Sequence, residues 1–172
     1  MYQIRIVLFA LFIINFFNNS VVAQTKTFSN NEITKLTNQA SSYLKEANFE
    51  KSLKISKLAL QKSIIANDFF ATTISYSTIA ANYAEIAEFD KAIFFYNKAM
   101  LYATKSTNDT LKNKINNNLG NIYCFEKKQY LKGINYYEKT LKYSQKIADS
   151  SQIFMTKLNI AWAYFDVGHF EK

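Results

Sequence analysis

The sequence predicts an all-α fold, a right-handed α-solenoid of antiparallel helix pairs. The first support is a scarcity of turn formers. The chain of 172 residues contains no Pro and only three Gly, which favours long helices joined by short turns over sheets and loop-rich folds. The second support is a set of aromatic residues that recur at intervals of 40, 41 and 40, namely Phe49, Phe89, Tyr130 and Phe170. A constant period of this length is typical of stacked helical repeats.

Acidic residues keep the same period. Asp68, Asp109 and Asp149 recur at intervals of 41 and 40. Asp is favoured at the start of a helix because its carboxylate accepts from unpaired backbone N–H groups and complements the helix dipole. We therefore expect turns at 66–68, 107–109 and 147–149, each followed by a helix that the Asp helps to begin.

Residues 1–23 are typical of an export signal peptide. Arg5 precedes an apolar run over 6–17, and Val21-Val22-Ala23 then offers small or medium side chains at the cleavage positions. The run is shorter than the roughly 20 residues of a membrane-spanning helix. We predict a signal peptide at 1–23 and a loose leader at 24–29, so that the protein is exported and is periplasmic or secreted. The alternative is a membrane-anchored protein that retains this segment.

The helical array is predicted to occupy residues 30–172. Its repeats are expected at about 30–67, 68–108, 109–148 and, truncated, 149–172. In the first repeat Ser29 and Glu32 fit a capping box, in which each side chain pairs with a backbone N–H near the other residue. Helices are expected at about 30–45 and 49–65, around a turn at 47–48.

The last two repeats depart from the simplest pattern. The third repeat has one extra residue, which we expect in its internal turn around 127–129. The fourth is expected to turn at Gly168 and His169 and to open a second helix at Phe170. A first helix without its partner would expose an apolar face, so the chain is interpreted as a fragment of a longer product.

Small and large residues alternate in the second and third repeats. Small residues are needed where two helices approach to about 8–10 Å, and large ones fill the grooves beside the crossing. In the second repeat the packing residues are expected to be Ile79, Ala80, Tyr83, Phe89, Ala92, Tyr96 and Ala99. In the third repeat they are expected to be Leu119, Gly120, Tyr123, Tyr130, Gly133 and Tyr137.

This arrangement resembles the tetratricopeptide repeat, with its W-x2-L-G-x2-Y and A-x3-F pattern. The period near 40 resembles a long variant of that family, as found in bacterial exported or sensor proteins, although it also overlaps the range of HEAT and armadillo repeats. The small-x3-aromatic pairs Ala92/Tyr96 and Gly133/Tyr137 favour the tetratricopeptide interpretation. The first repeat matches least, because Gln39 replaces a large apolar residue.

The charge balance is basic, with 21 Lys and Arg against 13 Asp and Glu and a net charge of +8. The lysines are spread along the chain, and the longest basic run is Lys127-Lys128. We interpret them as solvated helix faces and expect no nucleic-acid partner, since no arginine-rich patch or base-reading motif is present. Membrane contact is expected only through the signal peptide, an uncleaved anchor or a missing downstream segment.

Nothing in the sequence predicts catalysis. The chain has one His, His169, and one Cys, Cys124, and it lacks the common hydrolase, zinc-protease and phosphate-loop motifs. We expect no enzyme activity, no catalytic residues, no metal site and no cofactor. Cys124 is expected to be a small buried hydrophobe rather than a reactive thiol.

The resemblance implies a ligand groove lined by the first helix of each repeat. It places the following residues there: Ile74, Ser77, Ala81, Ala84 and Glu85; Lys114, Asn117, Asn121, Cys124 and Phe125; Met155, Leu158, Trp162, Phe165 and Asp166. The candidate ligand-binding residues are Lys114, Asn117, Asn121, Phe125 and Trp162. An Asn side chain both donates and accepts, so it suits a peptide backbone. The alternative is that these asparagines are merely solvated helix positions.

We expect a non-catalytic, exported scaffold that binds a protein or peptide of unknown identity. The alternative is the extracytoplasmic sensor segment of a longer signalling protein, with a histidine kinase or helix-turn-helix output module. Because many functions share this fold, the ligand itself is not predicted.

Overall fold

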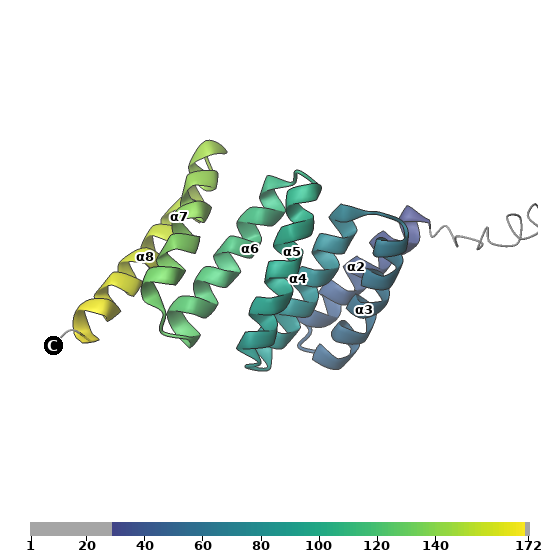
Figure 1. The fold of residues 1–172 in the computed structure, drawn as a ribbon, viewed down its shortest axis with the longest axis horizontal. Coiled ribbons are helices and arrows are strands. Elements are labelled where there is room, and N and C mark those ends of the chain that lie inside the picture. Colours follow the sequence, from purple (N-terminus) through teal and green to yellow (C-terminus); the bar gives the residue numbers. More distant parts are fainter. Residues whose placement is uncertain (1–28, 171–172) are drawn as a thin grey trace, which may run out of the picture.

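The computed structural model describes residues 29–170, which form an all-α array (Figure 1). Its helices are α2 (Asn30–Lys45), α3 (Phe49–Ile65), α4 (Phe69–Glu85), α5 (Phe89–Lys105), α6 (Asp109–Asn121), the π-helix η1 (Ile122–Glu126), α7 (Tyr130–Lys146) and α8 (Ser150–Phe170). No strand occurs in this part of the chain. The predicted all-α class is confirmed. The predicted signal peptide, and the leader up to residue 28, lie outside the described residues.

The helical hairpins follow one another along the length of the molecule, with α2 and α3 at one end and α7 and α8 at the other (Figure 1). Each helix packs against the next one in the chain, and α2 also contacts α4, which in turn contacts α6. This arrangement is compatible with the predicted α-solenoid. It places α2, α4, α6 and α8 together, and this set of helices lines the candidate site below.

The N-termini of α3, α4, α6 and α8 are capped by Asp or Asn side chains. Asp68 accepts from the backbone N–H of Ala71 at 2.9 Å, and Asp149 accepts from that of Gln152 at 3.0 Å. The prediction for Asp109 was one residue out. Asn108 is the N-cap of α6, and Asp109 is the first helical residue, where Lys112 pairs with it at 2.9 Å. Both residue types cap well, so the sequence alone does not separate them.

The predicted capping box at the start of α2 is wrong. The Ser29 hydroxyl accepts from the N–H of Asn31 at 3.3 Å. Glu32 does not return to Ser29, because its carboxylate pairs with Lys62 of α3 at 2.7 Å. An ion pair between α2 and α3 therefore takes the place of the predicted contact between Glu32 and the backbone of Ser29.

Each of the six turns between consecutive helices contains a residue with a left-handed backbone, and none of these residues is Gly. They are Ala47, Asn67, Ala87, Thr107, Lys128 and Ala148, with φ between 53° and 60°. The following N–H then reaches back to the preceding helix: Asn48 donates to the carbonyl of Tyr43, and Glu88 to that of Tyr83, both at 2.8 Å. This pairing satisfies helix-terminal carbonyls.

The extra residue of the third hairpin lies in a helix and not in the turn, contrary to our expectation. The turn at 127–129 has the usual length, with Lys128 as its left-handed residue. The residue is absorbed in η1, where the N–H of Lys127 donates five residues back to Ile122 at 2.9 Å. A π-helical segment accommodates one additional residue without ending the helix.

The small packing residues lie at close helix crossings. Ala80, Ala92 and Ala99 are fully buried. A Cβ atom on Gly120 would come within 2.6 Å of the Tyr137 ring, and one on Gly133 would meet Cys124. The large packing residues are buried, with Tyr83 and Phe89 only partly so.

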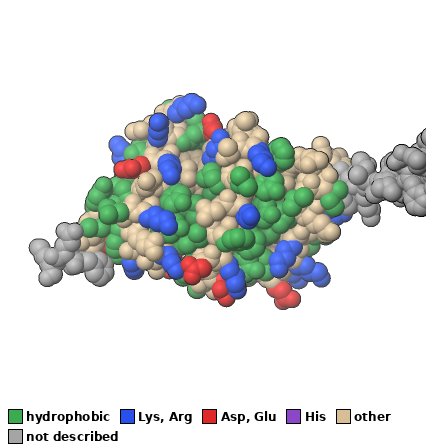
Figure 2. Space-filling model, in the orientation of Figure 1, with side chains coloured by type: hydrophobic (Ala, Val, Ile, Leu, Met, Phe, Trp, Pro, Cys, Tyr) green, Lys and Arg blue, Asp and Glu red, His purple; other side chains and the backbone are tan. Residues whose placement is uncertain are grey.

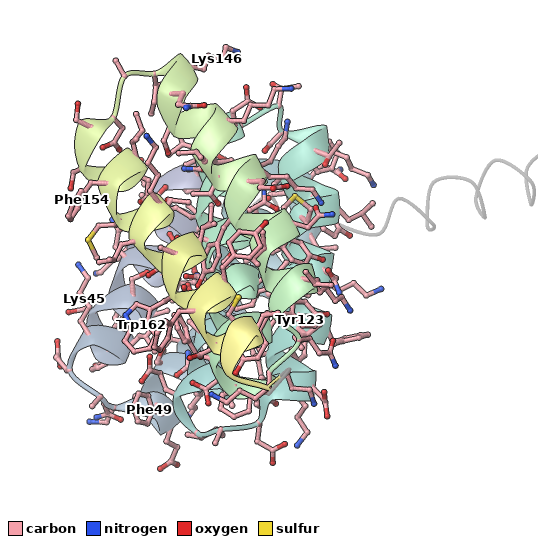
Figure 3. The ribbon with its side chains drawn as sticks, turned by 90° about the vertical axis from the view of Figure 1, so that its left-hand side faces the viewer. Lys45, Phe49, Tyr123, Lys146, Phe154 and Trp162 are labelled. Atoms are coloured by element: carbon pink, nitrogen blue, oxygen red, sulfur yellow. The ribbon has the colours of Figure 1, made fainter. Side chains whose placement is uncertain are left out.

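Helix α8 continues through Gly168 and His169, so the predicted turn there is wrong. Gly168 corresponds to the left-handed turn residue of the other hairpins, but it has no positive φ. The outer side of α8 exposes large apolar side chains, among them Phe154 and Trp162 (Figure 3).

Candidate peptide groove

Two adjoining hollows lie along the layer formed by α2, α4, α6 and α8. The first, of about 550 Å³, lies over α2, α4 and α6. The second, of about 890 Å³, lies between α4, the continuous helix α6–η1, and α8. Both are lined by Ala81 and Asn118, so together they form one groove across the layer.

The structure places four of the five candidate ligand-binding residues in this groove. Lys114 lines the first hollow, and Asn117, Asn121 and Phe125 line the second. Trp162 lines neither hollow: its side chain is half exposed on α8 and packs edge-to-face on Phe165. The sequence pattern correctly placed Trp162 on a helix that lines the groove. It did not determine which side of that helix, α8, faces the second hollow.

Some of the other groove positions implied by the resemblance line the hollows, and some do not. All five in the second repeat line the groove, and so does Met155. Leu158, Phe165 and Asp166 of α8 do not line it. Cys124 is fully buried, and burial raises the pKa of its thiol to about 11. It is displaced from the groove because the π-helical segment changes the helix phase.

Two asparagines of the second hollow are held with their amide N–H groups unused. Tyr137 donates from its hydroxyl to Oδ1 of Asn121 at 2.7 Å, and Gln152 donates to Oδ1 of Asn117 at 3.4 Å. No hydrogen bond uses Nδ2 of either residue within 29–170. Asn118 is oriented the other way, because its Nδ2 donates to Tyr96 Oη at 3.0 Å and leaves its carbonyl as an acceptor.

The supporting tyrosines stay protonated under ordinary conditions. Burial raises the pKa of both Tyr96 and Tyr137. A protonated hydroxyl can donate or accept: that of Tyr137 donates to Oδ1 of Asn121, and that of Tyr96 accepts from Nδ2 of Asn118. The hollow therefore presents two N–H donors and one carbonyl acceptor, the complement of a peptide backbone.

The groove is charged differently at its two ends. Lys114 is exposed in the first hollow, whereas Glu85 and Glu126 are exposed in the second. A ligand that spans both hollows would therefore meet a cation at one end and two carboxylates at the other.

Sequence reasoning missed several polar groove residues, chiefly Asn118, Gln152 and Asn159. The run Asn116-Asn117-Asn118 was a visible signal, but the family positions assign only Asn117 to the groove. Gln152 was missed because its contribution is a contact with another helix. Its partner Asn117 lies 35 residues earlier in the chain.

The described part of the chain contains no group of three or more His, Cys, Asp and Glu side chains that could hold a metal ion. None of its helices combines the length and apolar character needed to cross a bilayer. No family model matches this chain. No curated protein matches its sequence either. The fold and groove therefore define only a class, an all-α array of helical hairpins with a repeat-like arrangement.

Proposed function

We propose that this protein is a non-catalytic scaffold that binds an extended peptide segment of a partner protein in the groove over α2, α4, α6 and α8. The observation that carries the proposal is the pair of amide groups on Asn117 and Asn121. Their carbonyls are already occupied by Gln152 and Tyr137, so their N–H groups are oriented and unused. Pre-oriented donors of this kind reduce the ordering cost of binding.

The sequence pattern adds to this proposal. The resemblance to tetratricopeptide repeats implies recognition of peptides by the first helices of the hairpins, and residues 1–23 favour an exported protein. Binding of this kind requires no catalytic group, metal or cofactor. Phe125 and Met155 supply apolar surface in the second hollow, which suits a hydrophobic side chain of the peptide.

The test is selection from a random peptide display library on the full chain, followed by titration of a selected peptide. Asn121→Ala removes an amide donor and is expected to weaken binding by roughly three- to tenfold, the contribution of one neutral hydrogen bond. The matched control is Asn135→Ala, because Asn135 is exposed on α7 and does not line the groove. Equal affinities of the wild type and both variants would rule out the groove as the binding site.

The second candidate is an extracytoplasmic sensor segment of a longer signalling protein. The apolar outer side of α8 favours it, because Phe154 and Trp162 are more than half exposed and would suit contact with a further helix. Sequencing the gene beyond the codon for Lys172 tests this candidate. A membrane helix followed by a kinase or helix-turn-helix module supports it, whereas a stop codon removes it.

A further inference from the structure

Positive charge is concentrated on one set of helices. The lysines of α3, α5 and α7 are Lys51, Lys54, Lys57, Lys62, Lys91, Lys98, Lys105, Lys132, Lys139, Lys142 and Lys146. The same three helices contain only three acidic residues, Glu50, Asp90 and Glu138. The groove-lining helices, by contrast, have no net charge: Lys35, Lys45, Lys112, Lys114 and Lys157 are balanced by Glu32, Glu85, Asp109, Glu126 and Asp166.

The lysines of α5 and α7 follow one pattern with aromatic residues. On α5 the order is Lys91, Phe95, Lys98, Tyr102, Lys105, and on α7 it is Lys132, Tyr136, Lys139, Tyr143, Lys146. The successive spacings are 4, 3, 4 and 3 in both helices, which places each set on one helix face. We call these two sets the lysine–aromatic stripes. Lysines seven residues apart lie about 10 Å apart along a helix.

Two of the four aromatic rings in the stripes already carry a stripe lysine. Lys105 Nζ lies 5.1 Å from the centre of the Tyr102 ring, and Lys139 Nζ lies 4.8 Å from that of Tyr136. The Tyr136 ring also stacks on Tyr123 at 5.5 Å. The Tyr102 and Tyr136 rings therefore support these ammonium groups through cation–π contact, which leaves less of their faces free to stack on a base or a sugar.

Most of this charge has no acidic partner among the described residues. Within residues 29–170, Lys98, Lys105, Lys132 and Lys139 are exposed and form no ion pair. Figure 2 shows lysines interspersed with hydrophobic side chains over one face of the molecule, with fewer acidic side chains among them. Uncompensated charge on this scale favours an anionic partner.

Apolar side chains extend from the same helices. Phe94 and Leu101 of α5 are 55% and 52% exposed, and Leu131 of α7 is 73% exposed. Lys98 Nζ lies 5.5 Å from the Phe94 ring centre, so cation and apolar surface are adjacent. Lysines beside Phe and Leu are the combination that favours the interface of an anionic bilayer.

We propose that the lysine–aromatic stripes of α5 and α7 dock the protein on the surface of an anionic lipid bilayer. Two lysine columns on neighbouring hairpins match anions spread over a surface better than a single anionic strand. Phe94, Leu101 and Leu131 add apolar contact at headgroup depth. This is a further route to the membrane, separate from the terminal segments that the sequence analysis considered and from the peptide groove.

The test measures partitioning of the full chain to two kinds of vesicle, phosphatidylcholine alone and equal parts phosphatidylcholine and phosphatidylglycerol. The readout is the ratio of the two partition coefficients, because insertion of the apolar run 6–17 contributes to both. The double variant Lys98→Gln/Lys139→Gln is expected to lower this ratio roughly 30-fold, the combined effect of two lysines at an anionic surface. Lys35→Gln/Lys157→Gln removes the same charge from exposed sites on α2 and α8 and is expected to retain most of the ratio. Thermal unfolding verifies that both variants fold.

Three results would overturn the proposal. The wild type binds both kinds of vesicle equally, or the two double variants lower the ratio by the same factor, which would leave net charge alone as the cause. The third is tighter binding of a single-stranded DNA oligonucleotide than of anionic vesicles in the same buffer, which would assign the stripes to nucleic acid.

Discussion

Gly120 and Gly133 lie opposite each other where α7 crosses the helix formed by α6 and η1. A Cβ atom on Gly133 would lie 2.9 Å from the backbone nitrogen of Cys124 and 3.0 Å from the carbonyl oxygen of Gly120. Backbone atoms cannot rotate away as a flexible side chain can. The two helices can therefore cross this closely only because neither Gly120 nor Gly133 has a side chain.

Gly133→Ala is expected to destabilise the protein by about 1–3 kcal/mol, the usual cost of overpacking a core. Gly168→Ala is the matched control, because a Cβ there has no neighbour within 4 Å. In the last turn of α8 it is expected to stabilise by less than about 1 kcal/mol, the value for a helix interior. Urea unfolding measures both, and an unchanged midpoint for Gly133→Ala would remove the close-crossing argument.

The left-handed turn residues carry local strain because none is Gly. Thr107 is the extreme case, since it is β-branched and has φ of 53°. A left-handed backbone costs a non-Gly residue about 1–2 kcal/mol, and Gly avoids this cost but loses more entropy on folding.

Thr107→Gly is therefore expected to stabilise the protein by about 1 kcal/mol. Asn67→Gly at φ of 54° is expected to gain less, because Asn tolerates the left-handed region. Thermal unfolding of the two variants compares them. A lower melting temperature for Thr107→Gly would show that the side chain of Thr107 contributes more than its backbone strain costs.

At the scale of the element, the first hairpin has a different interior from the others. Helices α2 and α3 meet largely through small or hydroxyl side chains such as Ser52, Ser56 and Ala59. Ser52 donates to the carbonyl of Ala40 at 2.8 Å and accepts from Asn82 of α4 at 2.8 Å. The large buried apolar cluster begins with Ala80 and extends through α5 and α6 to Tyr123.

Amide hydrogen exchange is therefore expected to be fastest, among the hairpins, in α2–α3 and slowest in α6–α7. Small side chains bury little apolar area, so less free energy opposes opening of the first hairpin. Mass spectrometry of peptides that cover each hairpin makes the measurement. Uniform protection across all hairpins would indicate a single cooperative unit instead.

Much of this element structure followed from the sequence, since the recurring aromatics and Asp or Asn caps predict where helices begin. The position of the extra residue did not follow. The interval of 41 between Phe89 and Tyr130 is the same whether the residue lengthens a turn or forms a π-helical segment. The choice depends on packing around Tyr123 and Cys124, and it decides whether Cys124 or Phe125 faces the groove.

At the scale of the whole molecule, the two sides of the array differ in chemistry. The groove side is rich in amides and has no net charge on its helices, whereas the lysines gather on α5, α7 and α3. The sequence displayed the stripes as regular spacings, but individual lysines next to polar residues were interpreted as ordinary solvated positions. The contact of Lys132 with the ring of Tyr123, at 4.1 Å, joins α7 to η1 and cannot be deduced from spacing along one helix.

Trp162 is the only Trp in the chain and is half exposed on α8, outside both hollows. Its fluorescence is expected to have a solvent-exposed emission maximum and to be quenched readily by acrylamide. A peptide bound in the second hollow is expected to leave this emission nearly unchanged, because Trp162 does not line it. A large blue shift on peptide binding would place the ligand on the outer side of α8.

The stripes have one arithmetical consequence. Helices α5 and α7 present the same five-position pattern one hairpin apart. The pattern therefore belongs to the second helix of a hairpin and would be copied whenever a hairpin is duplicated. Duplication of a hairpin would add three cations at once, already aligned with the rest. Attachment strength would then change in whole steps, set by gene duplication rather than by point mutation.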